Sequence, residues 1–284
     1  MEKGEVIPLG DPWVLAQWGP MRLRVGAWRS GEPAGDASRR GARYALECFR
    51  EVAEHLPLLR LKAGRLRITP NLPRVLVAMI GAAQEVGDPD LTPLSAVAGA
   101  IAEGVAEAAA SEGADRVIAE NGGDIALHLQ DGQQIEVGVR PRVGEGRVRF
   151  RLKVKGSMGL RGVATSGLGG RSLTKGVVEA AVILAPRAAM ADAAATAVAN
   201  ATSIDSPAVR RLLAEELDPV TDLRGEWVTA EVGPLSPEEK RRALERGLFR
   251  AEELRKRGVI WGALLYLQGE IRWTQGMEGV LEEI

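Results

Sequence analysis

The sequence is poor in residues that form covalent or metal cross-links. Cys48 is its only cysteine, and His55 and His128 are its only histidines. One cysteine excludes an intrachain disulfide and two histidines exclude a histidine-rich metal site, while the lone thiol fits a cytoplasmic protein. Cys48 falls on the apolar stripe of a predicted helix and His128 in an alternating strand pattern, so we interpret both as structural.

No charge sign predominates, and no long apolar run is present. Lys and Arg total 37 against 38 Asp and Glu, which gives a net charge of -1. Such a balance provides no basic surface charge that would attract nucleic acid. An anionic ligand must therefore be bound by individual groups at its site. No apolar stretch reaches about 18 residues, and the acidic first twelve residues do not resemble a secretory signal. We therefore expect a cytoplasmic protein without nucleic-acid or membrane partners.

Helical and strand-like patterns mix along the whole chain. The spacing predicts a helix capped by Asp36 or Ser38, and a later helix that runs from Ser206–Pro207 to about Asp218. The other predicted elements are hairpins over 12–28 and 259–274, helices over 73–86, 93–112, 188–201 and from Ser236, and strands over 116–119, 125–129, 135–140, 147–155, 177–184 and 226–232. Strand edges near Val259 to Thr274 suggest a homodimer.

The alanine-rich helix over 188–201 contains a first candidate site. Asp192 and Thr196 are four residues apart, so they share one helical face, and only alanine lies between them. A carboxylate and a hydroxyl among small side chains leave room for a hydrated Mg²⁺ ion and ligand phosphates. The alternative is structural, with Asp192 near a helix start and Thr196 bonding back to its own turn.

A glycine- and hydroxyl-rich segment supplies a second candidate site. Thr165, Ser166, Gly167, Gly169 and Ser172 fall within eight residues, and Arg171 adds a cation. Glycines allow successive N–H groups to converge on an anion, although the segment lacks the P-loop ending and the dinucleotide fingerprint spacing. It would bind phosphate, or else it is an ordinary glycine-rich turn.

A third candidate, Asn121–Gly122–Gly123–Asp124, separates two strand-like runs. Asn-Gly commonly marks a tight turn, and the functional alternative is a backbone that passes close to a ligand.

Together, these three segments resemble the ApbE superfamily, the FAD:protein FMN transferases. Members carry an Asn-x-Gly-Gly-Asp turn, a Thr-Ser-Gly loop and an Asp-Ala-x-x-Thr-Ala helix, which match residues 121–124, 165–167 and 192–197 in order and approximate spacing. The small-residue segment over 98–104 resembles the family's Ala-Lys-Gly stretch. The resemblance covers roughly residues 93–201.

The resemblance implies an α+β, T-fold-like architecture of mostly antiparallel sheets with packed helices. It implies a single domain, with two intertwined halves (about 1–115 and 116–284) as an alternative. FAD would bind across the middle, with Mg²⁺ held by Asp192, Thr196 and a carbonyl at Ala100. Asp192 and Arg171 would be catalytic. The nucleotide contacts would be Asn121, Gly122, Gly123, Asp124, Thr165, Ser166, Gly167, Gly169 and Ser172.

In the family reaction, a hydroxyl of an acceptor protein attacks FAD, FMN becomes attached and AMP leaves; FAD pyrophosphate cleavage is a related activity. The sequence departs from the transferases because residues 171–176 lack the family's histidine and carboxylate, and because Glu103 replaces a lysine. These features resemble the cytosolic, UPF0280-like branch, although Arg171 replaces its histidine too. The alternative is therefore a non-catalytic accessory protein of sulfur assimilation into homocysteine, which binds a partner or a small anionic ligand.

Overall fold

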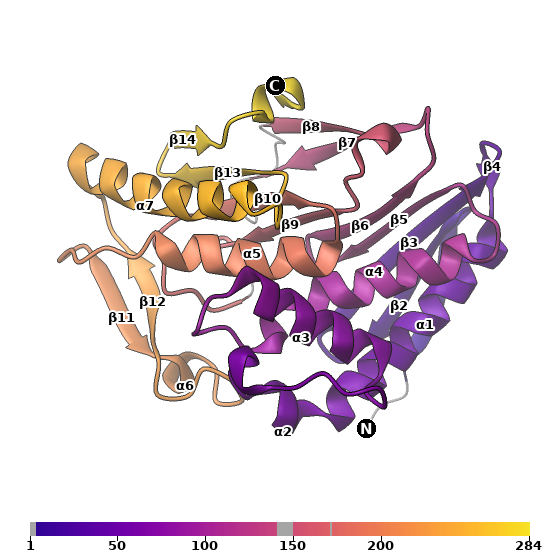
Figure 1. Ribbon diagram of the computed structural model, residues 1–284, viewed down its shortest axis with the longest axis horizontal. Helices are drawn as coiled ribbons and strands as arrows, with labels where there is room; N and C mark the ends of the chain where they lie inside the picture. Colours follow the sequence, from indigo (N-terminus) through magenta and orange to yellow (C-terminus); the bar gives the residue numbers. More distant parts are fainter. Residues whose placement is uncertain (1–3, 141–149, 171) are drawn as a thin grey trace.

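The chain folds around one antiparallel sheet of ten strands (Figure 1). The computed structural model describes residues 4–140, 150–170 and 172–284. The strand order is β1-β2-β3-β5-β6-β9-β10-β13-β14, with β4 paired to β3. These strands are β1 (Glu5–Gly10), β2 (Trp13–Trp18), β3 (Met21–Arg29), β4 (Glu32–Pro33), β5 (Arg116–Asn121), β6 (Asp124–Leu129), β9 (Gly162–Ser166), β10 (Ala180–Ala185), β13 (Gly262–Leu267) and β14 (Glu270–Trp273).

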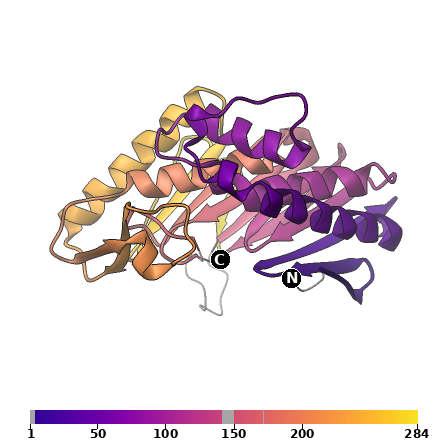
Figure 2. The ribbon, with the colours of Figure 1, turned by 90° about the horizontal axis from the view of Figure 1, so that it is seen from below.

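The helices cover one face of this sheet (Figure 2). α1 packs on β2 and β3, α4 on β5 and β6, α5 on β9 and β10, and α7 on β13, while α3 lies outside α5. The helices are α1 (Gly35–Glu54), α2 (Leu56–Leu59), α3 (Arg74–Val86), α4 (Val97–Ala110), α5 (Ala188–Ala201), α6 (Ala214–Leu217) and α7 (Pro237–Lys256). Short 3₁₀ turns are η1 (Ala63–Arg65), η2 (Pro93–Ala96), η3 (Gly156–Met158) and η4 (Met277–Gly279).

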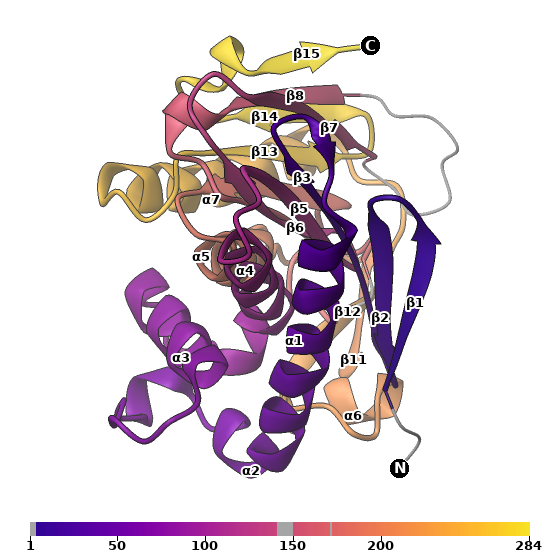
Figure 3. The same cartoon turned by 90° about the vertical axis from the view of Figure 1, so that its right-hand side faces the viewer.

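A small sheet covers part of the opposite face (Figure 3). Its order is β15-β8-β7, and a second core forms between its apolar side chains and those of β9, β10 and β13. A separate two-stranded sheet, β11-β12, lies beside α6. The bounds are β7 (Gln134–Val139), β8 (Phe150–Lys155), β11 (Val209–Leu213), β12 (Trp227–Val232) and β15 (Leu281–Glu283). The fold is thus α+β with antiparallel sheets, as predicted.

The two halves of the large sheet repeat one arrangement. Each half consists of a strand pair, two helices and a second strand pair: β2-β3-α1-α4-β5-β6 and β9-β10-α5-α7-β13-β14. β6 pairs with β9 at Ile125 and Val163, so the sheet continues across the junction. In this repeat β5 and β6 group with the first half; the division of the chain into domains stays a prediction.

Burial explains why these segments form these elements. β10 and β13 are buried along their whole lengths, as expected of central strands that are covered on both faces. β8 alternates buried and more exposed positions because only one of its faces meets a core. α5 is enclosed by the sheet, α3, α4 and α7, and alanine lets all of them approach it closely.

Two local predictions were wrong. The predicted helix after Ser206 is instead β11 followed by the short α6. The Ser206 hydroxyl accepts a hydrogen bond from Ala208 N and so forms a local turn instead of a helix cap. The residues that follow pair with β12, and this pairing outweighs their helical spacing. α1 also has no side-chain cap, because Ser38 Oγ accepts instead from Ala27 N of β3.

Within the described part of the chain, no helix is both long and apolar enough to cross a membrane. The predicted strand edge at Val259 to Thr274 belongs in part to β13, which is paired on both sides, so only β14 provides an outer edge there. The homodimer stays a prediction.

Candidate functional site

A polar stripe runs along the otherwise buried helix α5. Asp192, Thr196 and Asn200 are half-buried and follow one another at four-residue spacing, so they lie on one face. The helix has the predicted bounds, and Asp192 and Thr196 share a face as expected. Asn200 follows the same spacing, but the sequence interpretation considered only a carboxylate and a hydroxyl and missed it.

Asp192 contacts the start of α4. Its Oδ2 accepts a hydrogen bond from Gly99 N at 2.8 Å, and Gly99 lies in the first turn of α4, where main-chain N–H groups have no helical partner. Gly99 is required at this helix crossing, because a Cβ there would lie 2.3 Å from Ala188 O. The carboxylate therefore fixes α5 against α4.

The turn between β5 and β6 brings a second carboxylate to the same place. Gly122 and Gly123 have φ values of 69° and 110°, which suit the two-residue hairpin turn that their sequence predicts. Asn121 is buried, and its Nδ2 donates to Ala98 O at 3.3 Å. Asp124 Oδ1 accepts from Thr165 N at 3.1 Å. The turn thus joins the first turn of α4 to the end of β9.

Asp192 is electrostatically unfavourable as an anion. Burial raises the pKa of its carboxyl well above the ordinary value of 3.8, and the negative charge of Asp124 raises this pKa further. Hydrogen bonds from the main chain at Gly99 and Ala98 lower it in part. A cation placed between the two carboxylates would relieve both the burial cost and their repulsion.

The glycine-rich segment is held more firmly than an open anion loop. The N–H groups of Leu168 and Gly169 donate to Val178 O and Glu179 O, each at 3.0 Å, and Gly170 N donates to Gly167 O. Gly167 has φ 136°, and a Cβ there would lie 2.7 Å from Glu179 O. These amides are therefore engaged, and the exposed Thr165 and Ser172 provide the accessible hydroxyls, while Ser166 is buried. Arg171 lies outside the described residues.

Asn200 and Thr202 hold the other end of this segment on α5. Asn200 Oδ1 accepts from Lys175 N at 2.9 Å and from Thr174 Oγ1 at 3.2 Å, while Thr202 Oγ1 accepts from Val177 N at 3.0 Å. Gly176 allows this contact, since a Cβ would lie 1.8 Å from Ala199 O. The segment is thus anchored at Asp124 on one side and at the end of α5 on the other.

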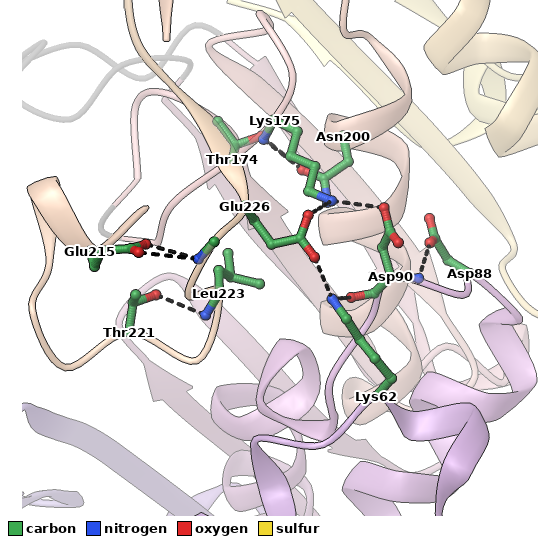
Figure 4. Close-up of polar contacts among 11 residues, drawn as sticks. Lys62, Asp88, Asp90, Thr174, Lys175, Asn200, Glu215, Thr221, Leu223 and Glu226 are labelled. Atoms are coloured by element: carbon green, nitrogen blue, oxygen red, sulfur yellow. Dashed lines mark hydrogen bonds and ion pairs between the residues drawn. The ribbon is translucent and has the colours of Figure 1, made fainter. Parts of the chain in front are cut away.

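An ion-pair cluster that sequence reasoning missed lies next to this anchor (Figure 4). Lys175 Nζ lies 2.7 Å from Asp90 Oδ2 and 3.0 Å from Glu226 Oε2, and Lys62 Nζ lies 3.0 Å from Glu226 Oε1. The sequence gives no reason to single out Lys175, because its ion-pair partners are distant along the chain. Hydrogen bonds from the lysines lower the pKa values of Asp90 and Glu226, and those carboxylates raise the pKa of Lys175 against its burial.

The remaining predicted residues have clear positions. Ala100 is buried in α4, next to Gly99. Glu103, which replaces the family lysine, accepts from Arg187 Nη2 at 2.7 Å and from Ala189 N at 3.1 Å, so it tethers the start of α5. His128 has a lowered pKa, mainly because of burial.

Two kinds of comparison identify relatives in sequence. The family model described as AbpE bacteria matches residues 6–273. A UPF0280 protein of Methanopyrus kandleri is 35% identical over 190 residues, which are 65% of this chain and 73% of that protein. A UPF0280 protein of Methanocaldococcus jannaschii is 38% identical over 128 residues, 45% of this chain and 49% of that protein. The matches thus span from about half to nearly three quarters of these relatives.

Among solved structures, the apo form of the flavinyl transferase ApbE of Pseudomonas stutzeri is similar in fold. The TM-score is 0.50 at 14% identity, and the match covers 99% of this chain and 98% of that one. The likeness therefore supports the predicted architecture. Since the family model covers most of the residues, the chain belongs to the family described as AbpE bacteria.

Proposed function

We propose that this protein binds FAD, or a related nucleotide diphosphate, together with Mg²⁺ at Asp192. The observation that carries the proposal is the pair of carboxylates, Asp192 and Asp124, which come from different elements; burial and the charge of Asp124 together raise the pKa of Asp192. A half-buried carboxylate pair is costly unless a cation or a proton compensates it. The similar P. stutzeri protein is a flavinyl transferase, which supports a flavin nucleotide as ligand.

The donors fit Mg²⁺ in type and number. Among the described residues no group of three or more His, Cys, Asp or Glu side chains gathers, so a cage of protein ligands is absent there. Mg²⁺ binds oxygen, keeps several waters and commonly takes one or two carboxylates plus substrate phosphates. Asp192 and Thr196 would hold it, with Asp124 nearby and the predicted carbonyl of Ala100 as a further ligand. Bound there, the ion would neutralise phosphate charge.

The chain's own residues would then position the nucleotide. The exposed hydroxyls of Thr165 and Ser172 would donate to phosphate oxygens, and Arg171 would stabilise charge that develops there. In FMN transfer, an acceptor-protein hydroxyl oxygen forms a bond to the FMN phosphorus, the bond to the AMP oxygen breaks, and AMP leaves. The proton of the acceptor hydroxyl passes to solvent water in this step.

A second candidate function, binding without turnover, has one specific observation in its favour. The amides of Leu168 and Gly169 are already bonded, and Lys175 is paired with Asp90 and Glu226. These amide donors and this lysine are therefore already occupied and are not free to bind a reacting phosphate. A non-catalytic accessory protein of sulfur assimilation would not need these groups to be free. Incubating the protein with FAD and Mg²⁺, with and without a cell extract that supplies acceptor proteins, and separating the products distinguishes the candidates, because only an enzyme releases AMP.

The metal assignment is tested with Asp192→Asn. The asparagine Oδ1 still accepts from Gly99 N, so the helix contact survives while the charge is removed. We expect FAD affinity in Mg²⁺, measured by titration calorimetry, to fall by at least about tenfold, the scale of a lost metal ligand contact. EDTA should weaken the wild type to the same level.

The matched control is Asp131→Asn, which removes one carboxylate from the exposed turn between β6 and β7. Its affinity should equal that of the wild type. An unchanged FAD affinity in Asp192→Asn, with the wild type binding FAD, would remove Asp192 from the metal site.

A further inference from the structure

A small cavity of about 130 Å³ lies where α4 and the start of α5 meet β6. One water occupies roughly 10–15 Å³ of such space, so the cavity has room for a ligand of about ten non-hydrogen atoms. Neither Asp192 nor Asp124 lines it. The lining residues are Glu103, Ala106 and Glu107 of α4, Ala126, Leu127 and His128 of β6, and Arg161, Pro186 and Arg187 from the segments before β9 and α5.

The charged groups of this cavity balance one another in number. Arg187 donates from Nε and Nη2 to Glu103 Oε1, at 2.9 and 2.7 Å, so these two charges neutralise each other. Arg161 and Glu107 remain, one of each sign, and both are exposed. Within the part of the chain that the structure describes, neither side chain has an ion pair or a hydrogen bond. The cavity thus presents a cation and an anion that do not reach each other.

Two further groups can donate into the same space. His128 is half-buried and forms no side-chain hydrogen bond with any described residue. Burial, and then the charge of Arg161, lower the pKa of its imidazole, so at pH 7 it is neutral and donates from one ring nitrogen. Arg187 retains its Nη1, because Glu103 engages only the other two nitrogens. With Arg161, these groups suit a carboxylate.

The floor of the cavity is apolar. Ala106 and Ala126 are 4% and 2% exposed and belong to the main core. Their methyl groups leave room for a short aliphatic group and offer it no polar contact. An anion alone would be repelled by Glu107 and an amine alone by Arg161, whereas a ligand that carries both charges satisfies both side chains.

We propose that this cavity binds a small α-amino acid, whose carboxylate accepts hydrogen bonds from Arg161 and His128 and whose ammonium group donates to Glu107. The aliphatic part of the ligand would lie on Ala106 and Ala126. This second site does not depend on nucleotide binding at Asp192.

The test uses three probes of one carbon chain in titration calorimetry. L-Alanine carries both charges, propionate lacks the ammonium group and ethylamine lacks the carboxylate. L-Alanine should bind at least about tenfold more tightly than either of the others, the scale of one hydrogen bond to a charged group. Equal affinities for L-alanine and propionate, or no saturable binding of glycine, L-alanine or L-serine, would overturn the proposal.

Two variants assign the charges. Arg161→Gln should weaken L-alanine and propionate by about tenfold each. Glu107→Gln should weaken L-alanine by about tenfold and strengthen propionate, because the repelling carboxylate is gone. Both side chains are exposed, so neither change disturbs the core. Arg246→Gln, which removes an exposed arginine of α7, is the matched control and should bind L-alanine like the wild type.

A third variant, Ala106→Met, fills the cavity from α4. It should reduce L-alanine affinity by at least about tenfold and leave the circular dichroism spectrum unchanged. Wild-type affinity for L-alanine in both Arg161→Gln and Glu107→Gln would place any bound amino acid elsewhere and would contradict the assignment, whether or not Ala106→Met folds.

Discussion

At the residue scale, Asp192 is under opposing influences. The hydrogen bond from Gly99 N favours the ionised carboxylate, while burial and Asp124 favour the protonated form and win, because the pKa is raised. In the protein without a cation, ionisation of Asp192 therefore lowers the free energy of unfolding. Residues held in costly states commonly belong to functional sites.

This cost predicts a pH dependence of stability. A carboxyl with a raised pKa in the folded state binds more protons folded than unfolded, so the free energy of unfolding decreases as pH rises from about 4 through the raised pKa. In metal-free protein, Asp192→Asn should therefore flatten the dependence of melting temperature on pH and should melt above the wild type at pH 8.

Saturating Mg²⁺ should stabilise the wild type at pH 8 and leave Asp192→Asn unchanged. A wild-type melting temperature that rises with pH over this range, and the same slope in the variant, would contradict the assignment.

The sequence predicted this site only in part. Helical spacing placed Asp192 and Thr196 on one face, and α5 has the predicted bounds. Spacing carries no information about Asp124 as the neighbour of Asp192, because that contact depends on how β6, β9 and α5 pack.

At the element scale, Asn200 determines how the glycine-rich segment lies on α5. Its side chain accepts from Lys175 N and Thr174 Oγ1. We expect Asn200→Ala to lower the free energy of unfolding by about 1–3 kcal/mol, the cost of an unsatisfied half-buried donor, and to weaken FAD binding. Urea unfolding and calorimetry measure the two effects.

Asn200→Asp is the matched variant, because a carboxylate oxygen can still accept from Lys175 N. It should retain most of the stability. If Asn200→Ala is as stable and binds as well as the wild type, the segment does not depend on this anchor.

Elements with a single consistent signal were predictable, and those with competing signals were not. Ser236 opens α7 with a capping box, a proline and an acidic first turn, and all three are present. Val209–Leu213 reads VRRLL, a mixed pattern that suits either a helix or a strand, and only its pairing partner β12 decides.

At the scale of the whole molecule, the Lys175 cluster ties four separate segments together. Lys62 lies before η1, Asp90 before η2, Lys175 before β10 and Glu226 directly before β12. Lys175→Met should cost about 1 kcal/mol, a modest value because Asp90 is largely exposed and solvent screens the pair. Limited proteolysis should then cut faster between α5 and α7.

The same cluster predicts weakening in acid. The pKa values of Asp90 and Glu226 are lowered in the folded state, so their contribution is complete above the ordinary carboxyl values and is lost as pH falls through the lowered ones. Lys175→Met should reduce this loss in melting temperature. An identical acid profile in the variant, or no response to added salt in the wild type, would exclude a role for the cluster.

The repeated sheet determines where the two carboxylates come from. Asp124 on β6 belongs to the first repeat and Asp192 on α5 to the second, and β6 and β9 join them. A chain with one repeat would contain only one carboxylate of the pair. The two carboxylates therefore come together only where the two repeats meet, and a cut between β6 and β9 would place them on different fragments.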